Sequence, residues 1–200
     1  MSNFLHQEPL ILASGSKIRS QLLETLGLAF SVVPAHCDED VIKKAHPSNN
    51  ILDLGFALAR SKALTVSAAH RQKFIIAADQ LCVIDDKILD KPITHKKAVE
   101  HLHLLNGRKH QQIVCLCIAH NNKIIWQHHD KAYLTVRDLS DEFIEHYLRE
   151  EQPYDSCGAY HFETQGNWLF KQIEGNTETI LGLPLIPLMN AFLELGIVKI

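Results

Sequence analysis

The sequence predicts an α/β fold with a mixed, twisted sheet and flanking helices. Over residues 10–105, short apolar runs typical of strands alternate with amphipathic helical patterns. Two longer strand-like stretches then follow each other over residues 110–136, joined by Asn121-Asn122, a dipeptide suited to a hairpin turn. Alternation in the first half and a hairpin in the second favour a mixed sheet over a purely doubly wound one.

Each expected element has its own local signal: apolar runs for strands, helical spacing and caps for helices, and Gly, Asn or Asp at the turns. In the first half we expect a strand at 10–13, a helix at 17–26 ending at Gly27, a strand at 30–34, a polar loop at 35–50, a helix at 51–69, a strand at 73–78, an extended stretch at 81–84 and a hairpin return at 87–89. In the second half we expect a helix from Thr94 to Leu105, the hairpin, a helix from Ser140 to Glu150, an irregular segment at 153–166, a strand at 168–173 and a last helix at 187–195.

Length and composition indicate one domain spanning residues 1–200, with 46% hydrophobic residues to form its core. The formal charge of −3 predicts no direct binding of nucleic acid. Five cysteines in apolar or loop contexts suggest no disulfide framework, which fits a reducing compartment. The first residues lack a basic segment, and the apolar run at 10–13 is too short for a membrane span. A soluble, cytoplasmic protein is therefore expected, with a homodimer left open.

The turn after the first strand is a candidate anion site. Ser14, Gly15 and Ser16 lead into a helix start, where hydroxyls, unpaired backbone N–H groups and the positive end of the helix dipole come together. Arg19, one turn into the helix, adds a forked cationic donor. A surface turn capped by serine would explain the same residues about equally well.

Acidic and basic residues elsewhere share this chemical theme. Glu39 lies in an acidic run, 38–40, whose carboxylates are hard oxygen ligands for Mg²⁺ or Mn²⁺ or are simply solvated. Asp79 is expected to end an apolar strand, at the edge of an α/β sheet where ligands gather. An Asp that merely initiates a turn would give the same local sequence. Lys62 lies on an alanine-rich helix, and Lys91 is fixed by the proline that follows it.

Considered together, these segments predict metal-assisted attack of water on a polyphosphate. Cationic side chains would hold the phosphate oxygens as charge builds on them, and a carboxylate would position the water. The 13 histidines do not suggest a separate metal site. The sequence contains neither a His-Glu-x-x-His nor a Cys-x-x-Cys spacing.

Along nearly its whole length the chain resembles the Maf family of nucleoside triphosphate pyrophosphatases. The resemblance is carried by short segments whose order and spacing match the family: Ala13-Ser14-x-Ser16-x-x-Arg19, Asp38-Glu39, Ala59-x-x-Lys62-Ala63, Ala78-Asp79-Gln80, Asp90-Lys91-Pro92, Gly158-Ala159-Tyr160 and Gly182-Leu183-Pro184-Leu185. It implies an elongated α/β fold with two lobes around a cleft, similar to inosine triphosphate pyrophosphatases.

The resemblance also implies an activity and roles for single residues. The family cleaves a nucleotide between its α and β phosphates with a divalent cation, Mg²⁺, Mn²⁺ or Co²⁺. Asp79 matches the proton acceptor and, with Glu39, the metal-linked acids. The matching phosphate-binding positions are Ser14, Ser16, Arg19, Lys62 and Lys91.

Three further positions bear on the preferred base. Gln80 and Glu163 resemble the branch that acts on 7-methyl-GTP rather than the dTTP/UTP branch. A carboxylate at Glu163 suits the donor edge of a cationic purine, and Tyr160, Phe162 or Trp168 could stack on it, although core packing is their commoner role. Ile18 departs from both branches, which commonly have Trp or Arg there, and it cannot stack on a base as Trp would.

Other departures from the family pattern are Lys17 for a proline, Ser20 for a second arginine and Ala77 for a glycine. The competing hypotheses are a dTTP/UTP pyrophosphatase and a nucleotide-binding regulator of septum formation and cell division. Retention of Asp79 argues against a pure binder, because binding needs no positioned base.

Overall fold

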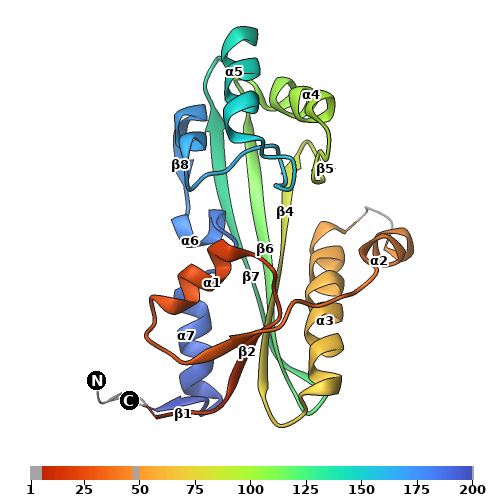
Figure 1. Ribbon diagram of the computed structural model, residues 1–200, viewed down its shortest axis with the longest axis vertical. Helices are drawn as coiled ribbons and strands as arrows, with labels where there is room; N and C mark the ends of the chain where they lie inside the picture. The colour runs from red at the N-terminus through yellow and green to blue at the C-terminus, as the bar shows by residue number, and fades with distance from the viewer. Residues whose placement is uncertain (1–5, 47–49, 200) are drawn as a thin grey trace. The chain divides into compact units, whose positions relative to one another are not determined.

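A computed structural model describes residues 6–46 and 50–199 and contains nine strands (Figure 1). The strands are β1 His6–Gln7, β2 Leu10–Leu12, β3 Phe30–Val32, β4 Phe74–Ile84, β5 Lys87–Leu89, β6 Lys109–His120, β7 Lys123–Val136, β8 Phe170–Glu174 and β9 Val198–Lys199. Seven of them form one sheet in the order β3-β2-β4-β6-β7-β8, with β5 paired to β4, and β1 pairs with β9 separately.

The seven-stranded sheet is mixed, as the sequence predicts. Strand β2 runs parallel to β3 and β4, with Ile11 opposite Ser31 and Ile75, whereas β5 and β8 pair antiparallel to β4 and β7. The turn between β6 and β7 has φ of 51° at Asn121 and 59° at Asn122. Both values lie in the left-handed region that asparagine tolerates and a type I′ hairpin requires.

The helices begin and end close to the positions that their caps indicate. They are α1 Lys17–Glu24, α2 Glu39–Ala45, α3 Ile51–Ala69, α4 His95–Leu105, α5 Asp141–Glu151, the 3₁₀ helix η1 Gln165–Leu169, α6 Thr177–Ile180 and α7 Leu185–Glu194. Thr94 and Ser140 cap α4 and α5 by accepting from the N–H groups of Lys97 and Phe143. None of the helices within the described ranges is both long and apolar enough to cross a membrane.

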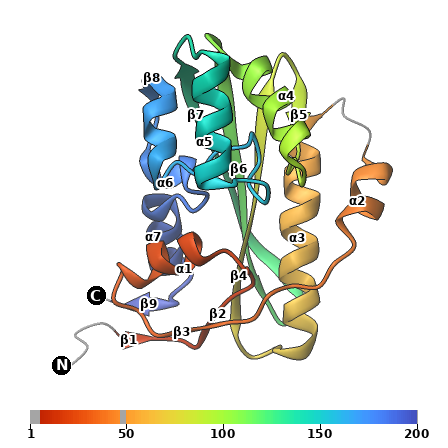
Figure 2. The ribbon, with the colours of Figure 1, turned by 45° about the horizontal axis from the view of Figure 1, so that its top comes forward.

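The chain forms two compact units. The first comprises Met1–Asp79, Val114–Asp130 and Gly182–Ile200, and the second comprises Gln80–Ile113 and Lys131–Leu181. In the first, α1 and α7 pack on one face of the strands through a core that includes Leu12, Leu23, Ile76 and Phe192. Helix α3 lies on the other face, where small residues such as Ala59 allow a close approach (Figure 2).

The second unit has its own core beneath α4 and α5, which pack against each other. Leu102 of α4 and Leu148 of α5 are fully buried there, together with Leu134 of β7 and Leu169 of η1. The same core contains Tyr160 and Phe162, which are 4% and 9% exposed. These two rings therefore pack in the protein interior and are removed from the candidates for stacking on a base, whereas Trp168 is 71% exposed.

Three sequence-based expectations need correction. The polar loop expected at 35–50 contains α2, which Asp38 caps through the N–H of Val41; residues 47–49 of that loop lie outside the described residues. The expected strand at 73–78 and the extended stretch at 81–84 are one strand, β4, because Asp79 continues the backbone instead of turning it. The last helix begins at Leu185, since a proline in the first turn of a helix costs no hydrogen bond.

Candidate active site

The turn predicted to hold an anion lies between β2 and α1, and its two serines are joined to the backbone. The Ser14 hydroxyl accepts from the N–H of Ser16 at 3.2 Å, and the Ser16 hydroxyl caps α1 by accepting from the N–H of Arg19 at 3.3 Å. The N–H groups of Lys17 and Ile18 lie in the first turn of α1, where the helix itself offers no acceptor. The turn therefore presents two donors together with the positive end of the helix dipole.

Arg19 ties this turn to two other segments of the first unit. Its guanidinium donates to the carbonyl of Ala78 at 2.9 Å, to that of Gly182 at 2.9 Å and to the Ser14 hydroxyl at 3.4 Å. Ala78 directly precedes Asp79 on β4, so Arg19 fixes the position of the serine turn relative to the backbone beside Asp79. Sequence reasoning placed Arg19 at the phosphates but missed this positioning role, since a backbone carbonyl carries no signal in the residue type.

An ammonium group that joins two carboxylates is the main feature of the site. Lys62 on α3 donates from Nζ to Oδ1 of Asp79 at 2.5 Å and lies 2.9 Å from Oε1 of Glu39, the first residue of α2. The side chains of Lys62 and Asp79 are 15% and 10% exposed, and that of Glu39 is 41% exposed. The structure thus brings together three residues that are 17 to 40 positions apart in the sequence.

The charges in this cluster keep Lys62 protonated. Burial is the largest single influence and would lower the pKa of Lys62, but the carboxylate of Asp79 and the hydrogen bonds to Asp79 and Glu39 together outweigh it. The net result is a pKa of Lys62 raised above its ordinary value, with Arg19 opposing it weakly. Lys62 is therefore a permanent cation at neutral pH.

Asp79 has one carboxylate oxygen without a protein partner among the described residues. Its Oδ1 is bonded to Lys62, and Oδ2 takes part in none of the hydrogen bonds among residues 6–46 and 50–199. Oδ2 is not one of the fully buried side-chain atoms that lack a partner in the described ranges, which are Nδ1 of His101 and Nδ1 of His110, so it keeps some contact with solvent. An ionised carboxylate with one anchored and one accessible oxygen is suited to accept a proton from water.

The donor set of this cluster fits a divalent cation only in part. Asp79 and Glu39 offer the hard oxygen ligands that Mg²⁺ and Mn²⁺ prefer. Within residues 6–46 and 50–199, however, no three His, Cys, Asp or Glu side chains gather into a group that could hold a metal ion. Two carboxylates are the usual protein contribution to a Mg²⁺ site that is completed by water and substrate phosphates.

Lys91 belongs to the second unit, in the segment between β5 and α4, and its side chain is exposed. The backbone after it is fixed: the N–H of Ile93 donates to the carbonyl of Tyr154 at 2.9 Å, and that of Thr94 donates to the carbonyl of Pro92 at 2.6 Å. Ile93 has φ of 62°, a rare conformation for a β-branched residue. The segment that carries Lys91 is held in a strained turn, as is common where a side chain must be positioned.

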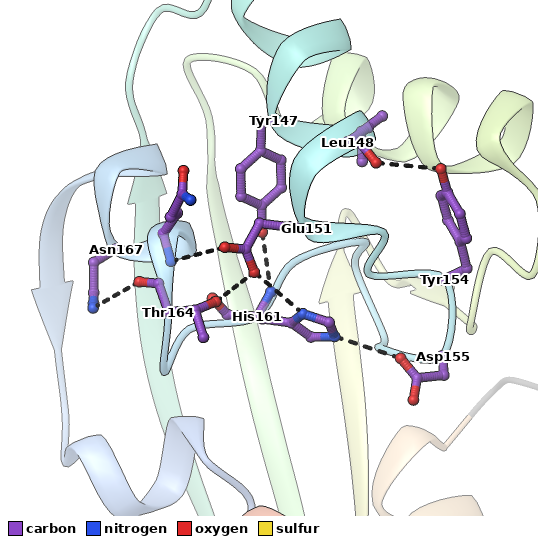
Figure 3. A network of polar contacts seen from close by, with 9 residues as sticks. Tyr147, Leu148, Glu151, Tyr154, Asp155, His161, Thr164 and Asn167 are labelled. Atoms are coloured by element: carbon purple, nitrogen blue, oxygen red, sulfur yellow. Dashed lines mark hydrogen bonds and ion pairs between the residues drawn. The ribbon is translucent and has the colours of Figure 1, made fainter.

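Glu163 also belongs to the second unit. In the sequence it lies between His161 and Thr164, and Glu151 of α5 contacts both of these residues (Figure 3). The Glu151 carboxylate accepts from the Thr164 hydroxyl at 2.6 Å and from the N–H of Gln165 at 3.4 Å, and it lies 3.5 Å from Nδ1 of His161. Glu163 itself is exposed. Glu151 therefore holds the loop by polar contacts on both sides of Glu163, which stays exposed.

Gln80 on β4 is another of the three residues predicted to determine specificity, and it is half-buried in the second unit. Its Nε2 donates to Oε1 of Gln112 at 3.0 Å and to the carbonyl of Ile180 at 2.7 Å. Ile18 is half-buried on α1 in the first unit. Sequence reasoning missed Gln112, although a glutamine inside the apolar run of β6 is a signal that could have identified it.

Comparisons with known proteins give a matching family and relatives that align over nearly the whole chain. The model of the family described as Maf-like protein matches residues 9–195. A nucleoside triphosphate pyrophosphatase of Legionella pneumophila (strain Paris) is 53% identical over 200 residues, which is 100% of both chains. A 7-methyl-GTP pyrophosphatase of Rhizobium meliloti (strain 1021) is 38% identical over 191 residues, covering 94% of this chain and 96% of that protein.

The fold has a counterpart among solved structures. The Ham1 protein of Staphylococcus aureus matches with a TM-score of 0.51 at 13% identity, covering 94% of this chain and 100% of that one. Fold and site together define an α/β protein with a serine–arginine turn beside a lysine-bridged pair of carboxylates. With the family model matching nearly the whole length, the chain belongs to the Maf family.

Proposed function

We propose that this protein hydrolyses the anhydride bond between the α and β phosphates of a nucleoside triphosphate, with 7-methyl-GTP as its preferred substrate. The reaction class is that of the relatives named nucleoside triphosphate pyrophosphatase, which are 53% identical over the full chain. One observation carries the proposal for the site: the Lys62 ammonium joins Asp79 and Glu39, and Asp79 keeps one oxygen open.

In the proposed reaction Asp79 acts as the general base. Its open oxygen Oδ2 takes a proton from a water molecule whose oxygen attacks the α phosphorus. The bond from that phosphorus to the bridging oxygen breaks, and pyrophosphate leaves with the bonding electron pair. The anchored oxygen Oδ1 keeps the carboxylate oriented through Lys62, as a base within hydrogen-bond reach of water requires.

The cations and backbone donors stabilise the charge that develops on the phosphoryl oxygens. Lys62 stays protonated and can donate to a phosphate oxygen, and the N–H groups of Lys17 and Ile18 at the start of α1 provide further donors. We assign Lys91 to the phosphates as a further positive charge through its match to the family's Asp-Lys-Pro segment. A divalent cation, held by Asp79 and Glu39 together with the nucleotide, would polarise the phosphoryl oxygens.

The proposed base preference depends on Gln80 and Glu163. Methylation at N7 makes the purine cationic, while its N1–H and amino group remain hydrogen-bond donors. An ionised Glu163 can accept from that edge and favours the positive ring, which an uncharged amide does less well. The relative from Rhizobium meliloti, named for 7-methyl-GTP, supports this choice. UTP hydrolysis is the alternative, because Ile18 cannot stack as a tryptophan would.

An Asp79→Asn variant tests the reaction. We expect pyrophosphate release to fall roughly 10²- to 10⁴-fold, the usual contribution of a general base, while nucleotide binding persists. The matched control is Asp53→Asn, at an exposed position in the first turn of α3. Release should be measured over a panel of nucleoside triphosphates with Mg²⁺, Mn²⁺ and Co²⁺. A variant as active as the wild type would remove Asp79 from the mechanism, and a wild type that binds nucleotides without turnover would favour the regulatory alternative.

A Glu163→Gln variant tests the base preference. We expect kcat/KM to fall more for 7-methyl-GTP than for UTP, because the substitution removes a negative charge that only the cationic purine exploits. Glu142→Gln, an exposed position on α5, is the control for loss of one surface charge. Equal losses on both nucleotides would contradict the assignment.

A further inference from the structure

A continuous chain of hydrogen bonds runs through the second unit behind Gln80. Gln80 donates to Gln112, Nε2 of Gln112 lies 2.6 Å from the Tyr160 hydroxyl, and that hydroxyl lies 2.9 Å from Nε2 of His110. Gln112, Tyr160 and His110 are 2%, 4% and 2% exposed. None of these four side chains has a formal role in the proposed proton transfer, yet three of them are polar groups buried at a cost.

Hydrogen-bond chemistry fixes the orientation of both amides in this chain. The Ile180 carbonyl can only accept, so the atom of Gln80 that faces it must be the amide nitrogen. The second hydrogen of that nitrogen points at Gln112, which must therefore offer its oxygen there and its own nitrogen to Tyr160. Reversing either amide would place two donors or two acceptors against each other.

The series of hydrogen bonds ends at the neutral imidazole of His110, which determines the direction of its last bond. Burial lowers the pKa of His110 to about 4, so the ring is uncharged at neutral pH. If the Tyr160 hydroxyl donates to Nε2, one buried group lacks a partner, the N–H at Nδ1. If the ring donates instead, both the phenolic hydrogen and Nδ1 lack one. The first arrangement is favoured, and Tyr160 then accepts from Gln112.

The consequence lies at the near end of the chain. Both hydrogens of the Gln80 amide are used inside the protein, and within the described residues its oxygen Oε1 accepts no hydrogen bond and is not shut off from solvent. We propose that Gln112, backed by Tyr160 and His110, is a specificity-positioning residue that locks Gln80 with Oε1 presented as an acceptor for the donor edge of the nucleobase. This inference rests on the proposed function and on the role of Gln80 in it.

Replacing Gln112 by leucine tests the proposal. Gln112→Leu leaves Gln80 held by Ile180 alone, so its amide can rotate. We expect kcat/KM for 7-methyl-GTP to fall at least about fivefold more than kcat/KM for UTP, the size of one lost hydrogen bond. Gln111→Leu is the matched control, since Gln111 is the preceding residue of β6 and points to the opposite face of the strand. Partial unfolding would lower both activities equally and leave their ratio unchanged.

A conservative variant separates positioning from packing. Burial raises the pKa of a carboxyl group, so Gln112→Glu places a neutral acid there, whose carbonyl accepts from Gln80 and whose hydroxyl donates to Tyr160. We expect its substrate ratio to lie closer to that of the wild type than the ratio of Gln112→Leu does. Should Gln112→Leu fail to fold, Tyr160→Phe removes only the phenolic oxygen and should shift the ratio in the same direction.

The outcomes distinguish this inference from the proposed function. An unchanged substrate ratio in Gln112→Leu, with pyrophosphate still released, would overturn the positioning role and leave the reaction intact. No release from the wild type on any nucleotide would overturn the proposed function itself. A ratio that shifts as much in Gln111→Leu as in Gln112→Leu would show a general disturbance of β6 and would also refute the inference.

Discussion

The polar groups of the two units solve different problems. In the first unit Lys62, Asp79 and Glu39 are charged, lie at the edge of the core and keep some exposure to solvent. In the second unit Gln112, Tyr160 and His110 are uncharged and almost completely buried. Charge acts over several ångströms and tolerates small displacements, whereas a neutral hydrogen bond depends on direction. The first set suits phosphate chemistry, and the second suits the orientation of a single amide.

Removing the central charge of the first unit should have the largest effect. Lys62→Met leaves Asp79 and Glu39 without their shared cation and removes the donor that we propose for the phosphates. We expect kcat/KM for any accepted nucleotide to fall about 10³-fold, which corresponds to roughly 4 kcal/mol of transition-state stabilisation. Initial rates of pyrophosphate release measure this, with Lys123→Met, an exposed position at the start of β7, as control. A loss confined to one nucleotide would contradict the view that the charged groups of the first unit act on the phosphates, which all the nucleotides share.

The second largest effect should come from the pH dependence of stability that the buried His110 causes in the second unit. The pKa of His110 is about 4 in the folded protein against 6.5 when the chain is unfolded. Below pH 6.5 the unfolded state takes up a proton that the folded state refuses, so stability is lost as the pH falls from 6.5 towards 4. The full loss is about 3 kcal/mol, and about 2 kcal/mol of it is reached at pH 5.

A His110→Phe variant isolates this contribution. Its free energy of unfolding in urea should fall less between pH 7 and pH 5 than that of the wild type, by about 2 kcal/mol. The pKa of His101 is also lowered, chiefly by burial with Lys97 adding to it, so His101 contributes with the same sign in both proteins and cancels. Identical pH dependence in the variant and the wild type would show that His110 is not the neutral end of the chain.

The contrast between the units also explains what the sequence could predict. The strand–turn–helix around Ser14 and the long helix of Lys62 have local signals, namely apolar runs and caps. Asp79 has one too, because it follows an apolar run, although the strand continues past it. The structure confirms the predicted mixed sheet. Its hairpin could be predicted because the turn at Asn121-Asn122 has the left-handed conformation that asparagine tolerates. Helix α2 was missed, since Asp38 as a cap is hard to tell from an acidic loop.

Contacts between distant segments had no such signal. The carbonyls of Ala78 and Gly182 accept from Arg19, and backbone atoms are the same in every residue type. Gln112 becomes meaningful only when Gln80, 32 positions away, lies beside it. Local chemistry can therefore be inferred from residue type and spacing, whereas the partners and directions of hydrogen bonds between distant segments require the three-dimensional structure.

The smallest expected effect concerns the polar contacts that Glu151 makes on both sides of Glu163. Glu151→Gln keeps the size of the side chain but weakens its bonds to Thr164, Gln165 and His161. We expect the free energy of unfolding to fall by about 1 kcal/mol, as for one partly buried charged hydrogen bond. The KM for 7-methyl-GTP should rise a few-fold with kcat nearly unchanged, because the loop positions Glu163 without touching the phosphates. Glu150→Gln, the exposed preceding residue on α5, is the control. A fall in kcat/KM as large as that expected for Lys62→Met would mean that charge in the second unit takes part in the chemistry.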